Sequence, residues 1–114
     1  MPVLKVKKNG EWEPVGLPTN IPTITNGMLN LASGDWYLDD DGLYHNDEND
    51  GNCVGVTANS TVIVTPATYP LDNFNAYVDY GICCNSQGDE FLGFVSDKDP
   101  SEYGDIVVNY TVFA

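Results

Sequence analysis

The clearest pattern in the chain is the alternation of apolar and polar residues in its C-terminal half. Residues 61–65 alternate, with Val62 and Val64 on one side and Ile63 on the other, and Pro66 ends the strand. Two further segments, 76–84 and 105–113, put apolar residues on one face. They are Ala76, Val78, Tyr80, Ile82 and Cys84 in the first, and Ile106, Val108, Tyr110 and Val112 in the second. Such alternation predicts antiparallel sheets with one face in water.

Turn residues divide the rest of the chain into short elements. Asn9-Gly10 between two alternating runs predicts a β-hairpin within residues 1–15, and Asp41-Gly42 predicts a turn between strands at 36–38 and 43–45. Residues 25–32 fit either a short strand or a helical turn, and no stretch offers three turns of amphipathic helix. The prediction is an all-β fold: an antiparallel β-sandwich with Greek-key or jelly-roll-like wiring and an N-terminal β-hairpin.

The predicted organisation has two parts. Residues 1–24 form the hairpin and an extended, proline-containing connector, and residues 25–114 form the β-sandwich module. No apolar run is long enough to span a bilayer, and the first eight residues lack the continuous apolar stretch of a signal peptide. We therefore expect a protein made in the cytoplasm.

Charge is the most unusual bulk property. The chain carries 17 acidic residues, four lysines and no arginine, a net charge of −13, and Lys98 is the only lysine after residue 8. Such a surface repels phosphate backbones and anionic lipids, so neither nucleic acid nor membrane is an expected partner. The acidity fits a soluble surface that resists nonspecific association better than it fits a dedicated cation-binding face.

Catalytic constellations are missing from the sequence. There is one histidine, no arginine and no glycine-rich phosphate loop. Asp89-Glu90 has the residue types of a glycosidase pair but lies at a predicted turn, and nothing in the sequence brings Cys83 to His45. The three cysteines cannot all pair within one chain, and we expect reduced thiols with Cys84 facing inward and Cys83 outward. The prediction is a protein without enzymatic activity.

An acidic segment between residues 39 and 50 offers two interpretations. Several carboxylates on a curved loop are what calcium requires, but Asp47, Asn49 and Gly51 break the register of an EF-hand, and turns favour Asp, Asn and Gly on their own account. Exposed aromatics beside carboxylates could also stack on sugars. The candidate ligand-binding residues are Trp36, Tyr37, Tyr44, Asp39 and Asp41, although the two adjacent aromatics 36 and 37 are expected to divide between core and surface.

Three motifs in order carry a resemblance to a protein family. They are the T-x-x-S-T-V-I-V-T-P run at Thr57 to Pro66, the strand and turn at Gly81 to Gly88, and the terminal strand at Asp105 to Phe113. The second follows the family pattern G-V-x-C-x-S-Q-G with Ile82 in place of the valine. Together they resemble the small β-module of tail and fibre-like structural proteins from phages and prophages of Gram-positive bacteria. The leader VLKVKKNGEWEPV (Val3 to Val15) is similar to the start of many structural proteins from the same phages.

This resemblance implies a virion protein that displays a β-module for host-surface attachment. The alternative is a capsid or tail decoration or assembly protein without a host ligand. The implied partners are other virion proteins, bound through the N-terminal segment, and a host cell-wall glycan. Because some strands are apolar on both faces and phage fibre modules are commonly trimeric, we also expect a homo-oligomer, with a trimer as the leading state.

Overall fold

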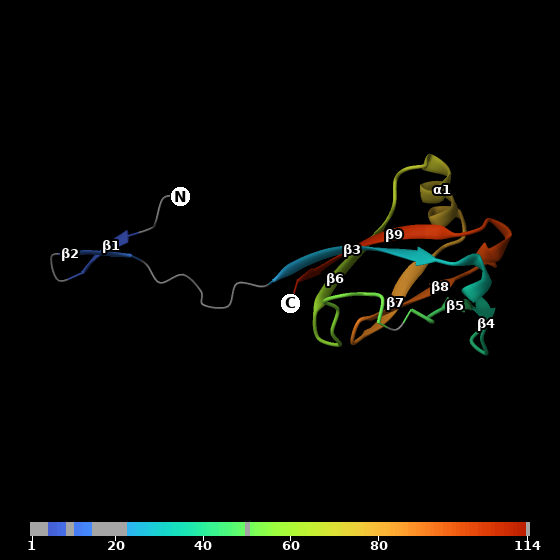
Figure 1. Cartoon of the computed structure of the whole chain (residues 1–114), viewed down its shortest axis with the longest axis horizontal. Helices are drawn as coiled ribbons and strands as arrows, with labels where there is room; N and C mark the ends of the chain where they lie inside the picture. The colour runs from blue at the N-terminus through green and yellow to red at the C-terminus, as the bar shows by residue number, and fades with distance from the viewer. Residues whose placement is uncertain (1–4, 9–10, 15–22, 50, 114) are drawn as a thin grey trace.

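The computed structural model describes residues 5–8, 11–14, 23–49 and 51–113, and of residues 5–14 only the backbone. It contains two larger antiparallel sheets (Figure 1). The three-stranded sheet has the order β3 (Ile24–Leu31), β9 (Ile106–Phe113) and β6 (Thr61–Pro66). The four-stranded sheet has the order β4 (Tyr37–Leu38), β5 (Tyr44–Asn46), β8 (Phe91–Ser96) and β7 (Cys83–Gly88).

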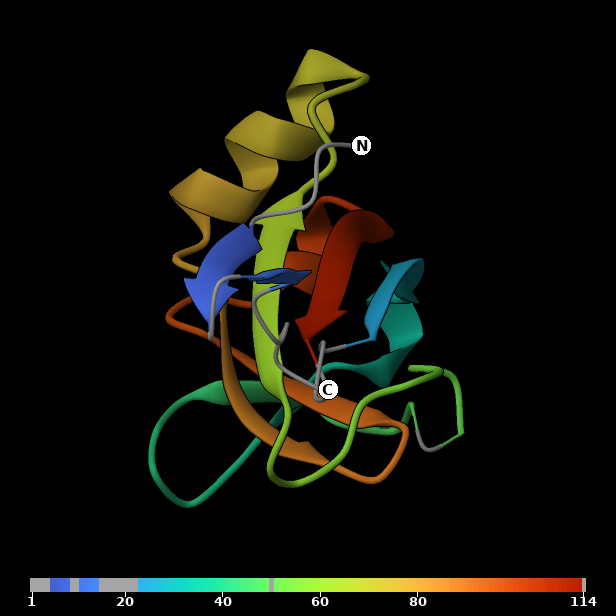
Figure 2. The same ribbon diagram turned by 90° about the vertical axis from the view of Figure 1, so that its left-hand side faces the viewer.

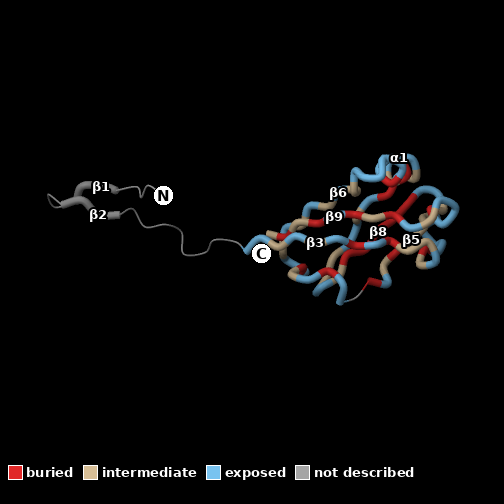
Figure 3. Tube along the Cα trace, turned by 45° about the horizontal axis from the view of Figure 1, so that its top comes forward, coloured by how far each residue is buried: buried red, intermediate tan, exposed pale blue. Residues whose placement is uncertain are grey.

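The two sheets pack face to face and enclose one core. Figure 2 shows β6 beside β9 in one layer, with β7 and β8 in the other. The largest fully buried apolar side chains come from both sheets and from the loop before β6: Leu31, Val56, Leu92, Phe94, Ile106, Val108 and Val112. Figure 3 shows this buried trace running through β8 and β9. The predicted all-β sandwich is confirmed.

Several local predictions are confirmed in detail. In β9 the four predicted apolar positions are buried and the intervening ones are not. In β6, Val62 and Val64 are half-buried against the core while Ile63 is exposed. The open alternative for residues 25–32 is decided in favour of strand β3. The turn at Gly42 has the positive φ of 81° that favours glycine.

The strand predicted over residues 76–84 is wrong for most of its length. Residues Leu71–Asp79 form helix α1, and strand β7 begins only at Cys83. Alternate apolar residues fit a strand, but positions 73, 76, 77 and 80 also recur at helical spacing. They form the inner side of the helix: Asn73 and Ala76 are buried, and Tyr77 and Tyr80 pack against the core.

The helix ends in a Schellman motif. Gly81 N–H donates to the Val78 carbonyl and Ile82 N–H to the Tyr77 carbonyl, both at 3.1 Å. Gly81 has φ of 65°, and a Cβ there would meet the Asp97 carboxylate. Ile82, the next residue, is buried in the core. The helix therefore ends here, and the chain continues into β7 at the edge of the four-stranded sheet.

Two buried asparagine side chains form hydrogen bonds with main-chain groups of β8 and β9. Asn73 accepts from Val107 N–H at 2.8 Å and donates to the Val107 and Ala67 carbonyls at 3.0 and 2.9 Å. Asn49 accepts from Leu92 N–H at 3.0 Å and donates to the Leu92 carbonyl. Asn49 and Asn73 thus provide hydrogen-bond partners for main-chain groups of Leu92 and Val107, and the Val107 carbonyl also accepts from Ala67 N–H at 3.0 Å.

The N-terminal hairpin is present as predicted. Strand β1 (Lys5–Lys8) pairs with β2 (Glu11–Pro14), with Lys8 opposite Glu11. The turn at Asn9-Gly10 and most of the predicted connector, residues 15–22, lie outside the described residues, so the division into anchor and module stays a prediction. Two 3-10 turns complete the fold, η1 (Ser33–Asp35) and η2 (Pro100–Glu102). Within the described ranges, no helix has the length and apolarity needed to cross a membrane.

Candidate functional site

The outer face of the four-stranded sheet carries a row of side chains in direct register. Tyr37 on β4 pairs with His45 on β5, His45 pairs with Val95 on β8, and Val95 pairs with Cys83 on β7. Since side chains alternate between the faces of a strand, these four point away from the core together. The row therefore places an aromatic ring, an imidazole and a thiol on one face, with Val95, which is only 6% exposed, buried between His45 and Cys83.

Tyr37 is the exposed aromatic of this row. Its ring is stacked on His45, with centroids 5.7 Å apart and planes at 25°, and 39% of the residue remains exposed. The hydroxyl donates to the Asp47 carboxylate at 2.8 Å. This hydrogen bond, together with desolvation and nearby carboxylates, raises the pKa of Tyr37 to about 12. Tyr37 is thus held in one orientation, with an apolar ring beside an acceptor oxygen.

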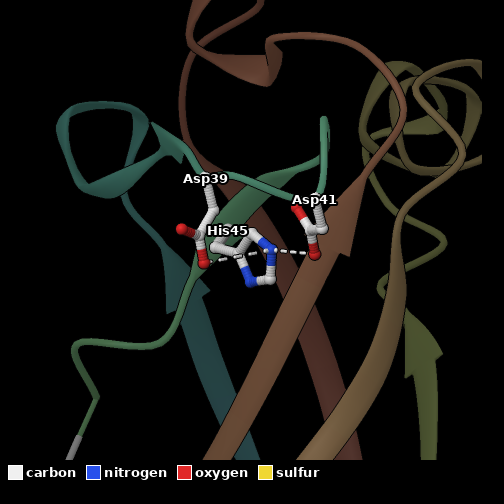
Figure 4. A group of neighbouring side chains, drawn as sticks. All are labelled: Asp39, Asp41 and His45. Atoms are coloured by element: carbon white, nitrogen blue, oxygen red, sulfur yellow. Dashed lines mark hydrogen bonds and ion pairs between the residues drawn. The ribbon is translucent and has the colours of Figure 1, made fainter.

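Two carboxylates from the β4–β5 turn converge on His45 (Figure 4). Asp41 Oδ2 lies 2.8 Å from His45 Nε2, and Asp39 Oδ2 lies 3.8 Å from the same nitrogen. Asp41 Oδ1 also accepts from Leu43 N–H at 2.9 Å, which closes the turn. The Leu43 hydrogen bond, followed by the one to His45, lowers the pKa of Asp41.

The same three residues offer one ligand atom each, all within 4.8 Å of one another. Calcium requires about six to eight oxygen ligands, and this set supplies two carboxylates and a nitrogen. The turn hydrogen bonds and the contacts to His45 already account for the arrangement of both acids. Among the described residues the acidic segment therefore lacks the oxygen cage of a calcium site.

The structure divides the candidate ligand-binding residues. Tyr37, Asp39 and Asp41 gather around His45 on the outer face. Trp36 is 9% exposed and belongs to the core, where its indole nitrogen has no hydrogen-bond partner within the described part of the chain, and Tyr44 packs inward against the core. The expected division of residues 36 and 37 between core and surface is confirmed, and Trp36 and Tyr44 have no ring free to stack on a ligand there.

His45 was not among the residues selected from the sequence. A usable signal was present, because His45 follows Asp41 by four residues across a predicted turn and Tyr37 precedes that turn symmetrically. Antiparallel pairing centred on Asp41 places the two rings opposite each other. A two-residue turn at Asp41-Gly42 would instead pair Tyr37 with Asn46.

A concave region opens between β6 and β7, the edge strands of the two sheets. It has a volume of about 540 Å³, and its lining comes from β6, α1 and β7: Val62, Val64, Tyr77, Cys83, Cys84, Asn85, Ser86 and Gln87. Gln87 Nε2 bridges the layers below it by donating to the Thr57 and Ser60 carbonyls at 2.8 and 2.7 Å. Among the residues that the structure describes, the crevice is lined by apolar, thiol, hydroxyl and amide groups and by no charged side chain.

The potential catalytic pairs are not assembled. Cys83 and His45 flank Val95 on successive strands, so two strand spacings, about 9.5 Å, separate their backbones. Asp89 and Glu90 are exposed at the β7–β8 turn, where the Glu90 carbonyl accepts from Gly51 and Cys53 N–H groups. All three cysteines are unpaired, and burial raises the pKa of the Cys53 thiol to about 11.

Comparison with known proteins gives no relative to set beside this site. No protein-family model matches the chain, and neither a curated protein nor a solved structure does.

Proposed function

We propose that this chain is a non-enzymatic structural protein of a phage or prophage particle, which displays its β-sandwich for attachment to the host surface. The proposal rests first on the motifs that resemble the tail and fibre-like proteins. Each motif coincides with a strand or its entry turn: Thr57 to Pro66 with β6, Gly81 to Gly88 with β7, and Asp105 to Phe113 with β9.

The observation that carries most weight is the contact between these motifs. Gln87 of the S-Q-G motif bonds to the carbonyls of Thr57 and Ser60, which open the first motif. Ser60 Oγ in turn accepts from Thr57 N–H at 2.9 Å. The first and last motifs pair along all six residues of β6. Because the motifs contact one another in the fold, their combined resemblance is better explained by one shared module than by chance similarity of separate strands.

The row around Tyr37 is the surface we assign to attachment, with a cell-wall glycan as the partner. Sugars bind through aromatic rings that cover their apolar faces and through carboxylates that accept from their hydroxyls. Tyr37 provides a fixed ring, and Asp39, Asp41 and Asp47 provide the acceptors.

The test is sedimentation of the purified protein with cell walls of candidate Gram-positive hosts. Tyr37→Ala should reduce wall binding by about tenfold or more, as expected for an aromatic anchor. Tyr103→Ala is the matched control, since Tyr103 is 40% exposed and lies on η2–β9, outside the row. Both variants should keep the thermal unfolding of the parent protein.

The outcomes separate the two structural roles. Saturable wall binding that Tyr37→Ala abolishes supports host attachment. The decoration or assembly role would be favoured if the protein bound none of the cell walls tested. It should then bind phage particles saturably and protect them from heat. Equal loss in the two variants would remove the Tyr37 row as the attachment surface.

A further inference from the structure

The described strands of the three-stranded sheet present no charged side chain on their outer face, and the Asp105 carboxylate lies at the rim, 3.0 Å from Asn30 Nδ2. Eleven side chains of β3, β9 and β6 alternate away from the core on this face. They are Ile24, Asn26, Met28, Asn30, Val107, Asn109, Thr111, Phe113, Thr61, Ile63 and Thr65. None is acidic or basic, although 18% of the chain is charged and its net charge is −13.

Large apolar residues on this face are strongly exposed. Met28 is 69% exposed, Ile24 61% and Ile63 53%. Met28 lies opposite the amide of Asn109 and Ile63 opposite the hydroxyl of Thr111, while Ile24 lies opposite the apolar Phe113. A contiguous patch of apolar and neutral polar groups is the composition of an interface, whereas a surface built only for solubility would carry charges here as well.

The outer face of this sheet has both a depression and a protruding side chain. A depression of about 340 Å³ lies between β3 and β9 and is lined by Asn26, Gly27, Met28, Asn109, Tyr110 and Thr111. Gly27 and Tyr110 are paired in its floor, and on the core side of the sheet the Tyr110 ring leaves no room for a Cβ at position 27. Ile63 stands across β9 from this depression, in register with Asn26 through Thr111. Knob and hole are therefore both present on one face.

We propose that this neutral face, the eleven residues given above, is where a second copy of the chain docks, face to face about a twofold axis. In such an isologous contact each copy offers the same patch, so the Ile63 knob of one copy can meet the depression of the other.

Charge decides in favour of a second copy. Two chains of −13 repel each other wherever their carboxylates meet, and the neutral face is the large strand surface on which they can approach without that cost. A basic partner protein would gain nothing from a neutral patch and would bind the acidic remainder instead.

The size of the face sets the expected strength. Three strands of up to eight residues span about 27 Å by about 14 Å, on the order of 400 Å². Stable complexes bury about 800 Å² on each partner, so the contact belongs to the weak class. We therefore expect weak, concentration-dependent association of the free protein.

Sedimentation equilibrium of the full chain, at increasing concentration up to about 1 mM, tests the proposal. The mass should rise from 12.4 kDa toward twice that value. Association should strengthen from about 0.05 M to about 0.5 M NaCl, because the Debye length falls to less than about 5 Å and like-charge repulsion is screened. Docking of a basic segment on acidic surface would respond to salt in the opposite direction.

Met28→Glu should weaken the association at least tenfold. Leu38→Glu is the matched control: Leu38 is 61% exposed on β4 of the other sheet, and the variant adds the same charge. Ile63→Glu provides a second probe on β6 should Met28→Glu disturb folding. A monomer at every concentration, equal weakening by Met28→Glu and Leu38→Glu, or an oligomer indifferent to both probes of the face would each overturn the proposal.

Discussion

Two exposed carboxylates fix turns by accepting main-chain hydrogen bonds. Asp41 accepts from Leu43 N–H at 2.9 Å. Asp105 accepts from Ser33 N–H at 2.9 Å and from Asn30 Nδ2 at 3.0 Å, so it ties β9 to the end of β3. In both cases the main-chain hydrogen bond is the first cause of a lowered pKa of the carboxyl group. The ionised form of each side chain is therefore the one that supports the fold.

Both carboxylates make the stability of the folded chain depend on pH. A carboxyl group whose pKa is lower in the folded chain stabilises it above the unfolded value of about 3.9 and loses that effect as pH falls through the folded pKa. We expect the unfolding temperature to drop below about pH 4, and Asp105→Asn to reduce the drop. Thermal unfolding from pH 7 to 2.5, with exposed Asp72→Asn as control, would measure it. An unchanged slope in Asp105→Asn would contradict this role.

Tyr37 offers a second titration at the same scale. Its hydroxyl donates to Asp47, and this bond is the main reason for a pKa of about 12. Asp47→Asn removes the carboxylate, so the pKa of Tyr37 should fall toward the ordinary value of about 10. Carbon-13 chemical shifts of the tyrosine rings between pH 8 and 12.5 resolve Tyr37 from the other tyrosines. A titration of Tyr37 near 10 in the parent chain would rule out the hydrogen bond.

At the scale of elements, helix α1 depends on one buried amide. Asn73→Ala would leave Val107 N–H without its acceptor and should lower the free energy of unfolding by about 2–3 kcal/mol. Asn75→Ala makes the same substitution at an exposed position of the same helix and should change it by no more than about 0.5 kcal/mol. Urea unfolding of the two variants is the measurement, and equal values would show that Asn73 does not pair with β9.

The helix also shows where pattern reading fails. Strands β6 and β9 were predictable because each has one face in the core and a period of two. Over residues 73–80 the apolar pattern fits both the strand period of two and the helical period of about 3.6. Asn73 decides between them, because it is buried by its hydrogen bonds to β9 and not by apolarity. A local pattern contains no information about a partner 34 residues away. Pro70 before the helix and Gly81 after it were the remaining signals of its ends.

The site was half predictable for a similar reason. Adjacent residues of a strand face opposite ways, so only one of Trp36 and Tyr37 could be on the surface. Which one faces outward depends on how β4 pairs with β5 and how β5 pairs with β8. The carboxylates Asp39 and Asp41 were identified from composition at the turn. Their convergence on His45 required the register of the hairpin.

At the scale of the whole molecule, the distribution of charge and core predicts an autonomous sandwich. The apolar core within the described residues lies between Leu29 and Val112. Removing residues 1–22 takes away three of the four lysines and two of the 17 acids, so the remainder, with 15 acids and Lys98, has a net charge of −14. Since the core is kept and the charge changes by one unit, we expect the shortened chain to fold with nearly unchanged thermal stability.

The same shortened chain separates the two expected modes of assembly. If copies meet through the neutral face, residues 23–114 contain the whole contact, and their self-association should match that of the full chain and strengthen with salt. If the predicted trimer depends on the N-terminal segment, the shortened chain should lose it while Met28→Glu in the full chain retains it. Circular dichroism and sedimentation equilibrium on the two lengths distinguish these cases. A shortened chain that does not fold would refute the division into residues 1–24 and 25–114, because the sandwich would then need the N-terminal segment for its own stability.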